Sequence, residues 1–384
     1  RPNTLPALGM LAAIAGFLAL QSVAYLRAGV FEYPLDDVYI HLAMASNIAQ
    51  GTYGVNAGEA ASAASSILYP LLLLPFPDTE FQRHLPLFWN LLAVAGAGWV
   101  WGRIAEEAQL TGIAAGVIVL LGPICLNIAG LGFTGMEAAP HLMASLLIVL
   151  GLWRALNGRG IAHWRIAAAI AAPLLRYEGL ALSLLASFVL FLHGERRAAL
   201  TIAVVTLGCM ALFSLFLVSL GLPAVPGSVL AKTTAMNAAG GLLDRLAVML
   251  IVNLRQPGGA LLGLLVLFAA LLPVVFLQLR HGAPFWMLAV TALAALAHLL
   301  VGQIGWMHRY EPYIVVSLFG AILLASSVLE KGAAVAVGGI AVVAVASSMF
   351  PRCGRDMSGT RARSIYSKRR WRALRSATSM RRSR

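Results

Sequence analysis

The chain has 384 residues, of which 60% are hydrophobic and only 11% are charged. This composition excludes an ordinary soluble domain, in which about a quarter of the residues are charged. The formal net charge is +13, but residues 352–384 hold twelve Lys and Arg against Asp356 alone, so the rest of the chain is nearly neutral. The high charge therefore belongs to a basic tail and does not indicate a nucleic-acid-binding domain.

Long runs without charge predict membrane helices. Most of them can cross a hydrocarbon core about 30 Å thick, which takes about 20 helical residues. The alternating pattern of barrel strands is absent. We therefore expect an all-α, polytopic helical membrane protein with about ten to twelve membrane segments, the first of them an uncleaved span over 8–26. The uncharged runs are 2–26, 108–136, 198–231, 256–279, 312–329 and 332–351.

The number of crossings between residues 67 and 130 is ambiguous. Residues 67–77 are short for a span. If 67–77, 85–101 and 111–130 all crossed the membrane, the number of crossings would put TGMEAA (134–139) on the wrong side. One of these three stretches is therefore expected to be a partial or interfacial segment.

A charged break divides the apolar stretch from 167 to 192. Residues 167–175 and 179–192 are each too short to cross fully, and Arg176 and Glu178 stand between them. Charges at a helix break are tolerated where the backbone lines water or protein and not lipid. The break therefore predicts a cavity on the outer side of the bundle.

The distribution of charge predicts which segments face the cytoplasm. Loops rich in Lys and Arg mark the cytoplasmic side of a membrane protein. Alternating spans then place the other polar segments, together with Asp36 and Asp37, on the outer face, so that five separate places converge there. The basic loops are 154–165, 193–197, 280–281 and 330–331, and the outer segments are TGMEAA (134–139), LRYEG (175–179), PGSVLAKTT (226–234) and MHRYEP (307–312).

The chain is therefore expected to have two regions. Residues 1–351 form a membrane domain with an outer loop at 31–66, and residues 352–384 form a basic tail whose composition is typical of disorder. The tail is either simply solvated or attracted to anionic lipid headgroups. A full span at 332–350 would put it outside, against the positive-inside rule.

The adjacent acids Asp36 and Asp37 are the first functional candidates. One reading is the N-terminus of an amphipathic helix over 38–50, where Asp is favoured by capping and by the helix dipole. That reading explains one Asp better than two, because adjacent like charges repel. A general base or a cation site uses such a pair, so we favour the functional reading.

The segment GLGFTG at 130–135 matches the pattern G-x-G-x-x-G, but we reject a dinucleotide site. No strand precedes it, and no βαβ unit fits between membrane segments. Its glycines suit a turn or close helix packing. Glu137 follows at the start of an apolar helix and is either a favourable contact with the helix dipole or a site residue.

Two further segments carry cations. Each segment has two possible roles, as interfacial side chains or as contacts to a phosphate. The segments are Lys232 and the run His308, Arg309 and Tyr310. The sequence has no P-loop, helix-turn-helix or zinc-finger pattern, and its three cysteines form no zinc or disulfide spacing. Nucleic acid is therefore not an expected partner.

Taken in order, these pieces resemble a known family. LDDVYIHLAMASNIAQGTYGVNAGEAASAASSILYPLLLL resembles the first outer loop of GT-C glycosyltransferases, in particular the bacterial arabinofuranosyltransferase-like group. The similarity continues through TGMEAA, LRYEG, VPGSVLAKTT and HRYEP and loosely covers residues 8–330. The chain departs from the family pattern at Tyr177, where Pro is usual, at Ala138, where Thr is usual, and at PGSVLAK.

The resemblance implies an inverting transfer from a polyprenyl-phosphate sugar to a hydroxyl of a glycan, lipid or protein acceptor. The reaction would take place on the periplasmic face of the bacterial inner membrane. Asp36 is expected to be the general base, with Asp37 orienting it or holding a divalent cation such as Mg²⁺, Mn²⁺ or Ca²⁺. Lys232 and Arg309 are expected to contact the phosphate. Further substrate-binding candidates are His308, Tyr310, Arg176, Glu178 and Glu137.

Two other classes compete with this reading. A transporter or flippase of a lipid-linked sugar would place its ionisable groups near the bilayer midplane, on broken helices with internal repeats. Here the charges cluster at span ends and no inverted repeat is evident, although the break at 176–178 suits a transporter. A structural membrane protein would use the acids only as caps.

Overall fold

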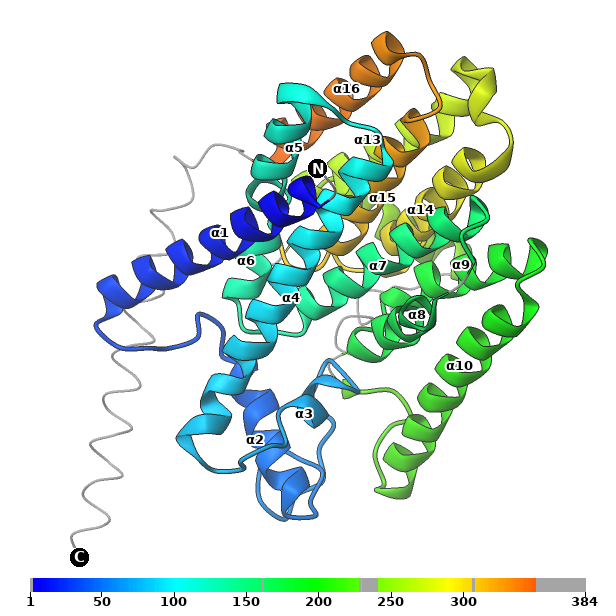
Figure 1. The fold of residues 1–384 in the computed structure, drawn as a ribbon. Helices are drawn as coiled ribbons and strands as arrows, with labels where there is room; N and C mark the ends of the chain where they lie inside the picture. Colours follow the sequence, from blue (N-terminus) through cyan, green and yellow to red (C-terminus); the bar gives the residue numbers. More distant parts are fainter. Residues whose placement is uncertain (1–2, 161, 228, 230–240, 306–307, 350–384) are drawn as a thin grey trace, which may run out of the picture.

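The computed structural model is an all-α bundle, as the sequence predicted (Figure 1). The structure describes residues 3–160, 162–227, 229, 241–305 and 308–349, and no strand occurs in these ranges. Lys232 and the basic tail at 352–384 lie outside the described residues. In chain order the helices are α1 (Thr4–Ala28), α2 (Asp37–Ala49), α3 (Tyr69–Leu72), α4 (Glu80–Glu107), α5 (Gly112–Cys125), α6 (Ile128–Phe133), α7 (Ala138–Leu156), α8 (His163–Leu175), α9 (Gly179–Leu192), α10 (Arg196–Ser219), α12 (Leu242–Leu254), α13 (Pro257–Val275), η2 (Leu277–Leu279), α14 (Gly282–Val301), α15 (Pro312–Ser326) and α16 (Lys331–Met349).

The lengths of the apolar helices are those of a polytopic membrane protein. Within the described residues, seven helical segments are long and apolar enough to cross a bilayer. They are α1, α4, the pair α5 and α6, α7, α10, α13 and α14. Three shorter apolar helices accompany them, at Gly179–Leu192, Pro312–Ser326 and Lys331–Val342. The predicted class is confirmed, with fewer full-length spans than the ten to twelve segments expected.

The partial segment expected between residues 67 and 130 is the first of the three stretches. Its helix α3 has only four residues, whereas α4 has 28. Residues 112–133 span the bundle as α5 and α6, with a break at Asn127, whose φ of 58° lies in the left-handed region. Asn adopts that conformation more readily than most residues, which explains why the chain turns there.

Helix α15 lies at the centre of the bundle. All of its residues from Pro312 to Ser326 are buried, and it packs between α14, α7 and α16. A helix that is apolar on every side belongs in a core. Pro312 stands in the first turn, where its missing N–H costs no hydrogen bond. The residues just before α15 are therefore attached to a helix that is buried along its whole length.

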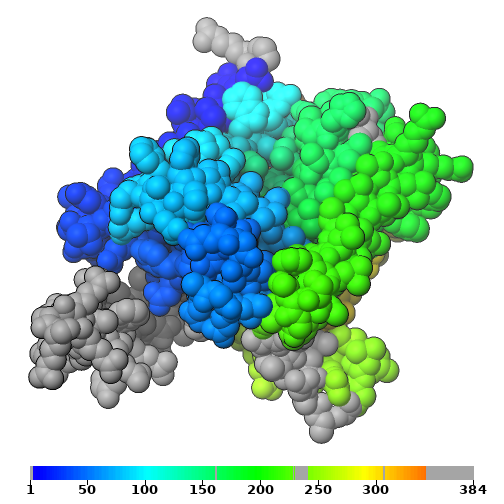
Figure 2. All heavy atoms as spheres, turned by 90° about the horizontal axis from the view of Figure 1, so that it is seen from below, coloured from blue at the N-terminus to red at the C-terminus, as the bar shows by residue number. Residues whose placement is uncertain are grey.

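Residues 29–79 form a cap at one end of the bundle, below α4 in Figure 1. Figure 2 shows this face, where the cap lies beside the C-terminal end of α10. Tyr53 packs edge-on against Phe216, with ring centroids 5.2 Å apart. The Gly227 N–H donates to the Ser62 carbonyl over 3.1 Å. These contacts fix the outer loop predicted at 31–66.

The predicted break between α8 and α9 is present, and it anchors the cap. Helix α8 ends at Leu175 and α9 begins at Gly179. Near the end of α8 the Leu174 carbonyl accepts the Ile67 N–H over 3.0 Å and the Ser66 hydroxyl over 3.2 Å. Carbonyls at a helix C-terminus need partners from outside the helix. The cap residues Ser66 and Ile67 supply these partners, and the bonds hold the cap against the break between α8 and α9.

Candidate functional site

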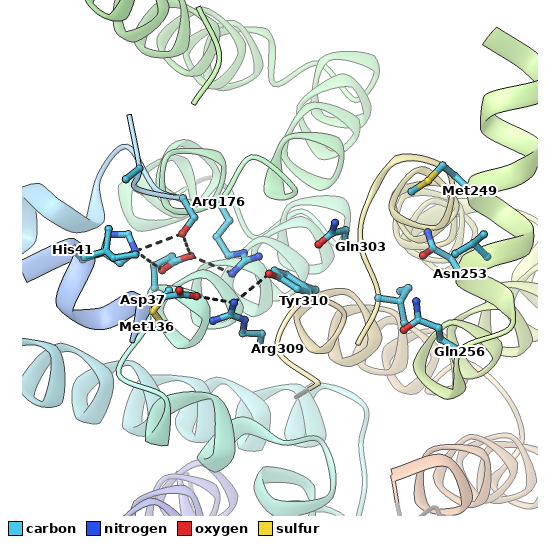
Figure 3. Close-up of a pocket in the computed structure, with 16 residues that line it drawn as sticks. Asp37, His41, Met136, Arg176, Met249, Asn253, Gln256, Gln303, Arg309 and Tyr310 are labelled. Carbon is cyan, nitrogen blue, oxygen red and sulfur yellow. Dashed lines mark hydrogen bonds and ion pairs between the residues drawn. The ribbon is translucent and has the colours of Figure 1, made fainter. Parts of the chain in front are cut away.

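A cavity of about 780 Å³ opens where the cap meets the bundle (Figure 3). It is lined from four of the five places that the sequence predicted to converge. They are the start of α2, the turn before α7, the break between α8 and α9, and the loop before α15. The fifth place, 226–234, is described only at residues 226, 227 and 229, and its Lys232 lies outside the described residues. The charged or titratable lining residues are Asp37, His41, Glu137, Arg176, Arg309 and Tyr310.

Asp37 and Arg309 form an ion pair across this cavity. Arg309 Nη2 lies 2.8 Å from Asp37 Oδ2. The side chain of Arg309 is only 7% exposed, whereas that of Asp37 is 44% exposed. Asp37 therefore remains open to a ligand while it balances the charge of Arg309.

The guanidinium of Arg309 is only partly satisfied. Nη2 also donates to the Tyr310 hydroxyl over 3.2 Å, but Nε and Nη1 are buried and have no hydrogen-bond partner among the described residues. Leaving buried donors unpaired costs free energy, so such groups in native proteins call for an explanation. An anion bound in the cavity would supply the missing acceptors.

Glu137 is the centre of a buried ionic cluster. Its side chain is fully buried and accepts from Arg176 Nη1 over 3.2 Å and from the Ser65 hydroxyl over 2.8 Å. His41 Nε2 lies 3.3 Å away. Burial alone would raise the pKa of Glu137, but the His41 hydrogen bond, the Arg176 charge and the Ser65 hydrogen bond together lower it. Glu137 is thus an ionised anchor whose Oε1 accepts both hydrogen bonds, while Oε2 has only the His41 ring beside it.

Although Glu137 stands at the N-cap position of α7, it makes no capping hydrogen bond. The sequence left two readings open, a contact with the helix dipole or a site residue. The carboxylate instead joins α2 to the break before α9 through His41 and Arg176. Glu137 therefore positions the residues around the cavity.

Arg176 is held from both sides. Its side chain is 2% exposed, and Nη2 donates to Glu178 Oε1 over 3.1 Å, in addition to its bond with Glu137. Burial alone would lower the pKa of Arg176, but the charges of Glu178 and Glu137 raise it. The guanidinium is therefore permanently charged, which explains why the chain tolerates it at a helix break.

Tyr310 connects the two arginines. The guanidinium carbons of Arg176 and Arg309 lie 5.0 Å and 5.2 Å from the centre of its ring. Both distances suit a cation–π contact, which is strongest where water is excluded. The buried Tyr310 ring therefore fixes the separation of the two cations.

The loop that carries Arg309 is tied down by Glu311. Glu311 is buried, with Oε2 accepting the Gly305 N–H over 3.0 Å and Oε1 lying 3.0 Å from His308 Nδ1. The hydrogen bond to Glu311 raises the pKa of His308, against the effect of partial burial. Asn127, at the break between α5 and α6, donates to the His308 carbonyl over 3.0 Å. His308 thus serves the loop and does not line the cavity.

The opposite wall of the cavity is uncharged. It comes from the end of α12, the start of α13 and the loop after α14. Asn253 Nδ2 donates to the carbonyls of Leu299 and Gly302, over 2.9 Å and 3.0 Å. Gln256 and Gln303 stand beside it in Figure 3, facing the charged wall across the cavity.

Asp36 lies apart from this arrangement. It occupies the N-cap position of α2 but makes no capping hydrogen bond, it is exposed, and it does not line the cavity. The structure thus separates the two acids that the sequence treated as one pair. Glu178 and Tyr177 line a neighbouring cavity of about 420 Å³, which shares Ser65 and Gln303 with the first.

Sequence reasoning missed His41, Ser65, Asn253 and Gln256. A signal existed for His41, because it follows Asp37 by four positions and therefore shares its helix face. Ser65 belongs to an irregular segment, and it reaches Glu137 beside the neighbouring Ser66, which bonds to the Leu174 carbonyl. No local pattern predicts that meeting.

The described residues do not form a ready-made cation site. Among them, no group of three or more His, Cys, Asp and Glu side chains is placed to hold a metal. Asp37, on which a divalent cation was expected, is instead balanced by Arg309. The metal therefore stays a prediction. Comparison with known proteins adds no assignment, since no family, curated protein or solved structure matches the chain.

Proposed function

We propose that the protein is a membrane glycosyltransferase of the GT-C type, as the resemblance to the arabinofuranosyltransferase-like group implies. It transfers a sugar from a polyprenyl-phosphate donor to an acceptor hydroxyl. The observation that carries the proposal is the buried Arg309, which faces the open carboxylate of Asp37 in a cavity at the end of membrane helices and has two nitrogens without a partner in the part of the chain that the structure describes. A cation and a carboxylate are the two groups that this reaction needs.

Arg309 binds the donor phosphate. The guanidinium matches phosphate oxygens in a bidentate geometry, and Nε and Nη1 are the free donors. The phosphodiester of the donor carries one negative charge and the departing polyprenyl phosphate carries two. Arg309 therefore stabilises the transition state more than the bound donor, which is the condition for catalysis.

Asp37 is the general base in this proposal. It takes the proton of the acceptor hydroxyl as that oxygen forms a bond to the anomeric carbon, and the bond from this carbon to the phosphate oxygen breaks with its electron pair leaving on the phosphate. Attack opposite the leaving group inverts the anomeric configuration. Asp37 replaces Asp36 in this role because Asp37 lines the cavity and Asp36 does not.

Donor binding and base activation are coupled in the proposal. Asp37 is paired with Arg309 over 2.8 Å, so its Oδ2 is engaged by the guanidinium. A donor phosphate competes with Asp37 for the same guanidinium. Once Arg309 turns to the phosphate, Asp37 is free to accept a proton, so the acceptor is activated only when a donor is present.

The same argument gives the proposed location. A lipid-linked donor presents its sugar at the membrane surface, and the basic loops opposite the site favour an outer position by the positive-inside rule. We place the reaction on the periplasmic face of a bacterial inner membrane.

A transporter or flippase of a lipid-linked sugar is the second candidate. The broken pair α8 and α9 favours it, because broken helices carry the binding sites of many transporters. Such a protein would move the donor without breaking its sugar–phosphate bond.

A panel of polyprenyl-phosphate sugars, radiolabelled in the sugar, separates the two candidates. The purified protein in liposomes is expected to release polyprenyl phosphate and label an acceptor, and Asp37→Asn is expected not to. Movement of intact donor across the bilayer without cleavage would favour the flippase. Neither cleavage nor movement with any donor would overturn both proposals.

A further inference from the structure

The cavity divides into two walls of different chemistry, and Figure 3 shows them facing one another. The charged wall carries Asp37, Glu137, Arg176 and Arg309. The other wall contributes side-chain amides and apolar groups and no charge; its lining residues are Met249, Val252, Asn253, Gln256, Gln303 and Ile304. We infer that this amide wall binds the hydroxyl groups of the donor sugar and sets which sugar is accepted, an inference that rests on the proposed function.

The chemistry of the amide wall suits a neutral polyhydroxylated ligand. A sugar hydroxyl both donates and accepts a hydrogen bond, and a side-chain amide offers both capacities without charge. Ligand pockets generally combine apolar surface with a few placed polar groups that fix orientation. Met249, Val252 and Ile304 supply the apolar surface between the amides.

Asn253 is a fixed acceptor. Its side chain is 2% exposed, and both amide hydrogens are used by the carbonyls of Leu299 and Gly302. The group that Asn253 offers to a ligand is therefore its carbonyl oxygen Oδ1. These two bonds also tie the end of α12 to the end of α14, so the acceptor is held on rigid elements.

Gln256 is the adaptable member of the wall. It is partly exposed to the cavity, its backbone N–H donates to the Asn253 carbonyl over 3.0 Å, and its side chain has no hydrogen bond within the described residues. The amide is thus free to both donate and accept. One fixed acceptor beside one donor–acceptor matches two neighbouring hydroxyls of a sugar ring.

Each wall of the cavity binds a different part of the donor. The phosphate is drawn to Arg309, and the sugar attached to it reaches across the cavity to Asn253 and Gln256. An amide wall that reads only the sugar contributes to binding of the donor but not to binding of polyprenyl phosphate, which lacks the sugar. This difference separates the inference from a general structural role.

The test compares Gln256→Ala with the unaltered protein, using the polyprenyl-phosphate sugar that the unaltered protein transfers. We expect kcat/KM for the donor to fall about 3–10-fold, as for loss of one neutral hydrogen bond. The inhibition constant of polyprenyl phosphate should not change. Gln278→Ala, at an exposed amide outside the cavity, is the matched control and should change neither value. Arg309→Ala should weaken binding of polyprenyl phosphate as well.

A second arm examines selectivity with a donor whose sugar lacks one ring hydroxyl. The unaltered protein should prefer the complete sugar, and Gln256→Ala should lose about 3–10-fold of that preference. Three outcomes in Gln256→Ala would contradict the role of the amide wall in sugar binding without contradicting the glycosyltransferase proposal. They are transfer with unchanged selectivity, a parallel loss of polyprenyl phosphate binding, and a change confined to the acceptor KM. Absence of transfer by the unaltered protein overturns the proposed function itself, together with this inference.

Discussion

Arg309 Nη2 lies 2.8 Å from Asp37 Oδ2, and this contact joins the loop before the central helix α15 to the first residue of the surface helix α2. The pair brings together residues that are far apart in the chain. In the proposed mechanism, Asp37 is the base and Arg309 the phosphate-binding cation, and this ion pair opens when the donor binds. The predictions below begin with these two side chains.

Replacing Asp37 with Asn should reduce sugar transfer by about 10²–10⁴-fold, the usual range for loss of a general base. Asn keeps the size of the side chain, so the yield and folding of the protein should be nearly normal. Initial rates at saturating donor and acceptor measure the effect.

Asp36→Asn is the matched control for this change. Asp36 is exposed and outside the cavity, so its replacement should cost much less than that of Asp37. A large loss in Asp36→Asn with normal turnover in Asp37→Asn would restore the assignment expected from the sequence and exclude Asp37 as the base.

Arg309→Ala should lower kcat/KM for the donor by about 10–150-fold, since a hydrogen bond to a charged group contributes about 1.5–3 kcal/mol. The maximal rate should fall as well, because the charge on the phosphate grows as the bond breaks. Donor titrations at saturating acceptor measure both quantities.

Arg309→Lys tests the geometry of the same contact. Lys keeps the charge but not the fork of parallel donors, so it should recover only part of the loss. Full recovery would show that charge alone matters. Unchanged donor kinetics in Arg309→Ala would remove Arg309 from the site.

The features that the sequence predicted correctly are those that depend on local composition. The apolar runs gave the helical class, the short stretch at 67–77 became the four-residue α3, and the charges at 176–178 marked the break. Hydropathy controls each of these features directly, because a segment that is charged or too short cannot cross the hydrocarbon core as a continuous helix.

The features that the sequence could not predict depend on contacts between distant segments. Asp36 and Asp37 are alike in sequence, and only the start of α2 decides which one faces the cavity. The amides Asn253 and Gln256 stand in an apolar context without any motif. Their role follows from the position of α12 against α14, which no local pattern encodes.

Glu137→Gln should destabilise the fold by about 3 kcal/mol, the lower end of the range for breaking a buried ion pair, because Arg176 keeps Glu178. Thermal unfolding of the purified protein measures it. Glu106→Gln is the matched control, since Glu106 pairs with Arg103 where both side chains keep about a quarter of their surface exposed, and pairs open to solvent contribute at most about 1 kcal/mol. Equal effects in both variants would show that Glu137 is no anchor.

The Glu137 cluster also predicts a loss of stability in acid. The folded pKa of Glu137 lies below its ordinary value of 4.5, so the unfolded chain binds the proton more readily. The stabilisation is complete above pH 4.5 and is lost as the pH falls below that value toward the folded pKa. The unaltered protein should therefore lose more stability than Glu137→Gln between neutral pH and pH 4. Parallel curves would contradict the assignment.

Protonation of His308 should strengthen donor binding through the loop that carries Arg309. The pKa of His308 is raised above 6.5 by its hydrogen bond to Glu311, so the contribution of this pair is complete below pH 6.5 and is lost as the pH rises through the folded pKa. Donor KM should accordingly rise with pH above 6.5. His308→Asn is the informative variant, because Asn tolerates the left-handed φ of 51° at this position and does not titrate. In that variant the rise in KM should disappear. The same rise in both proteins would show that the His308–Glu311 pair does not control the position of Arg309.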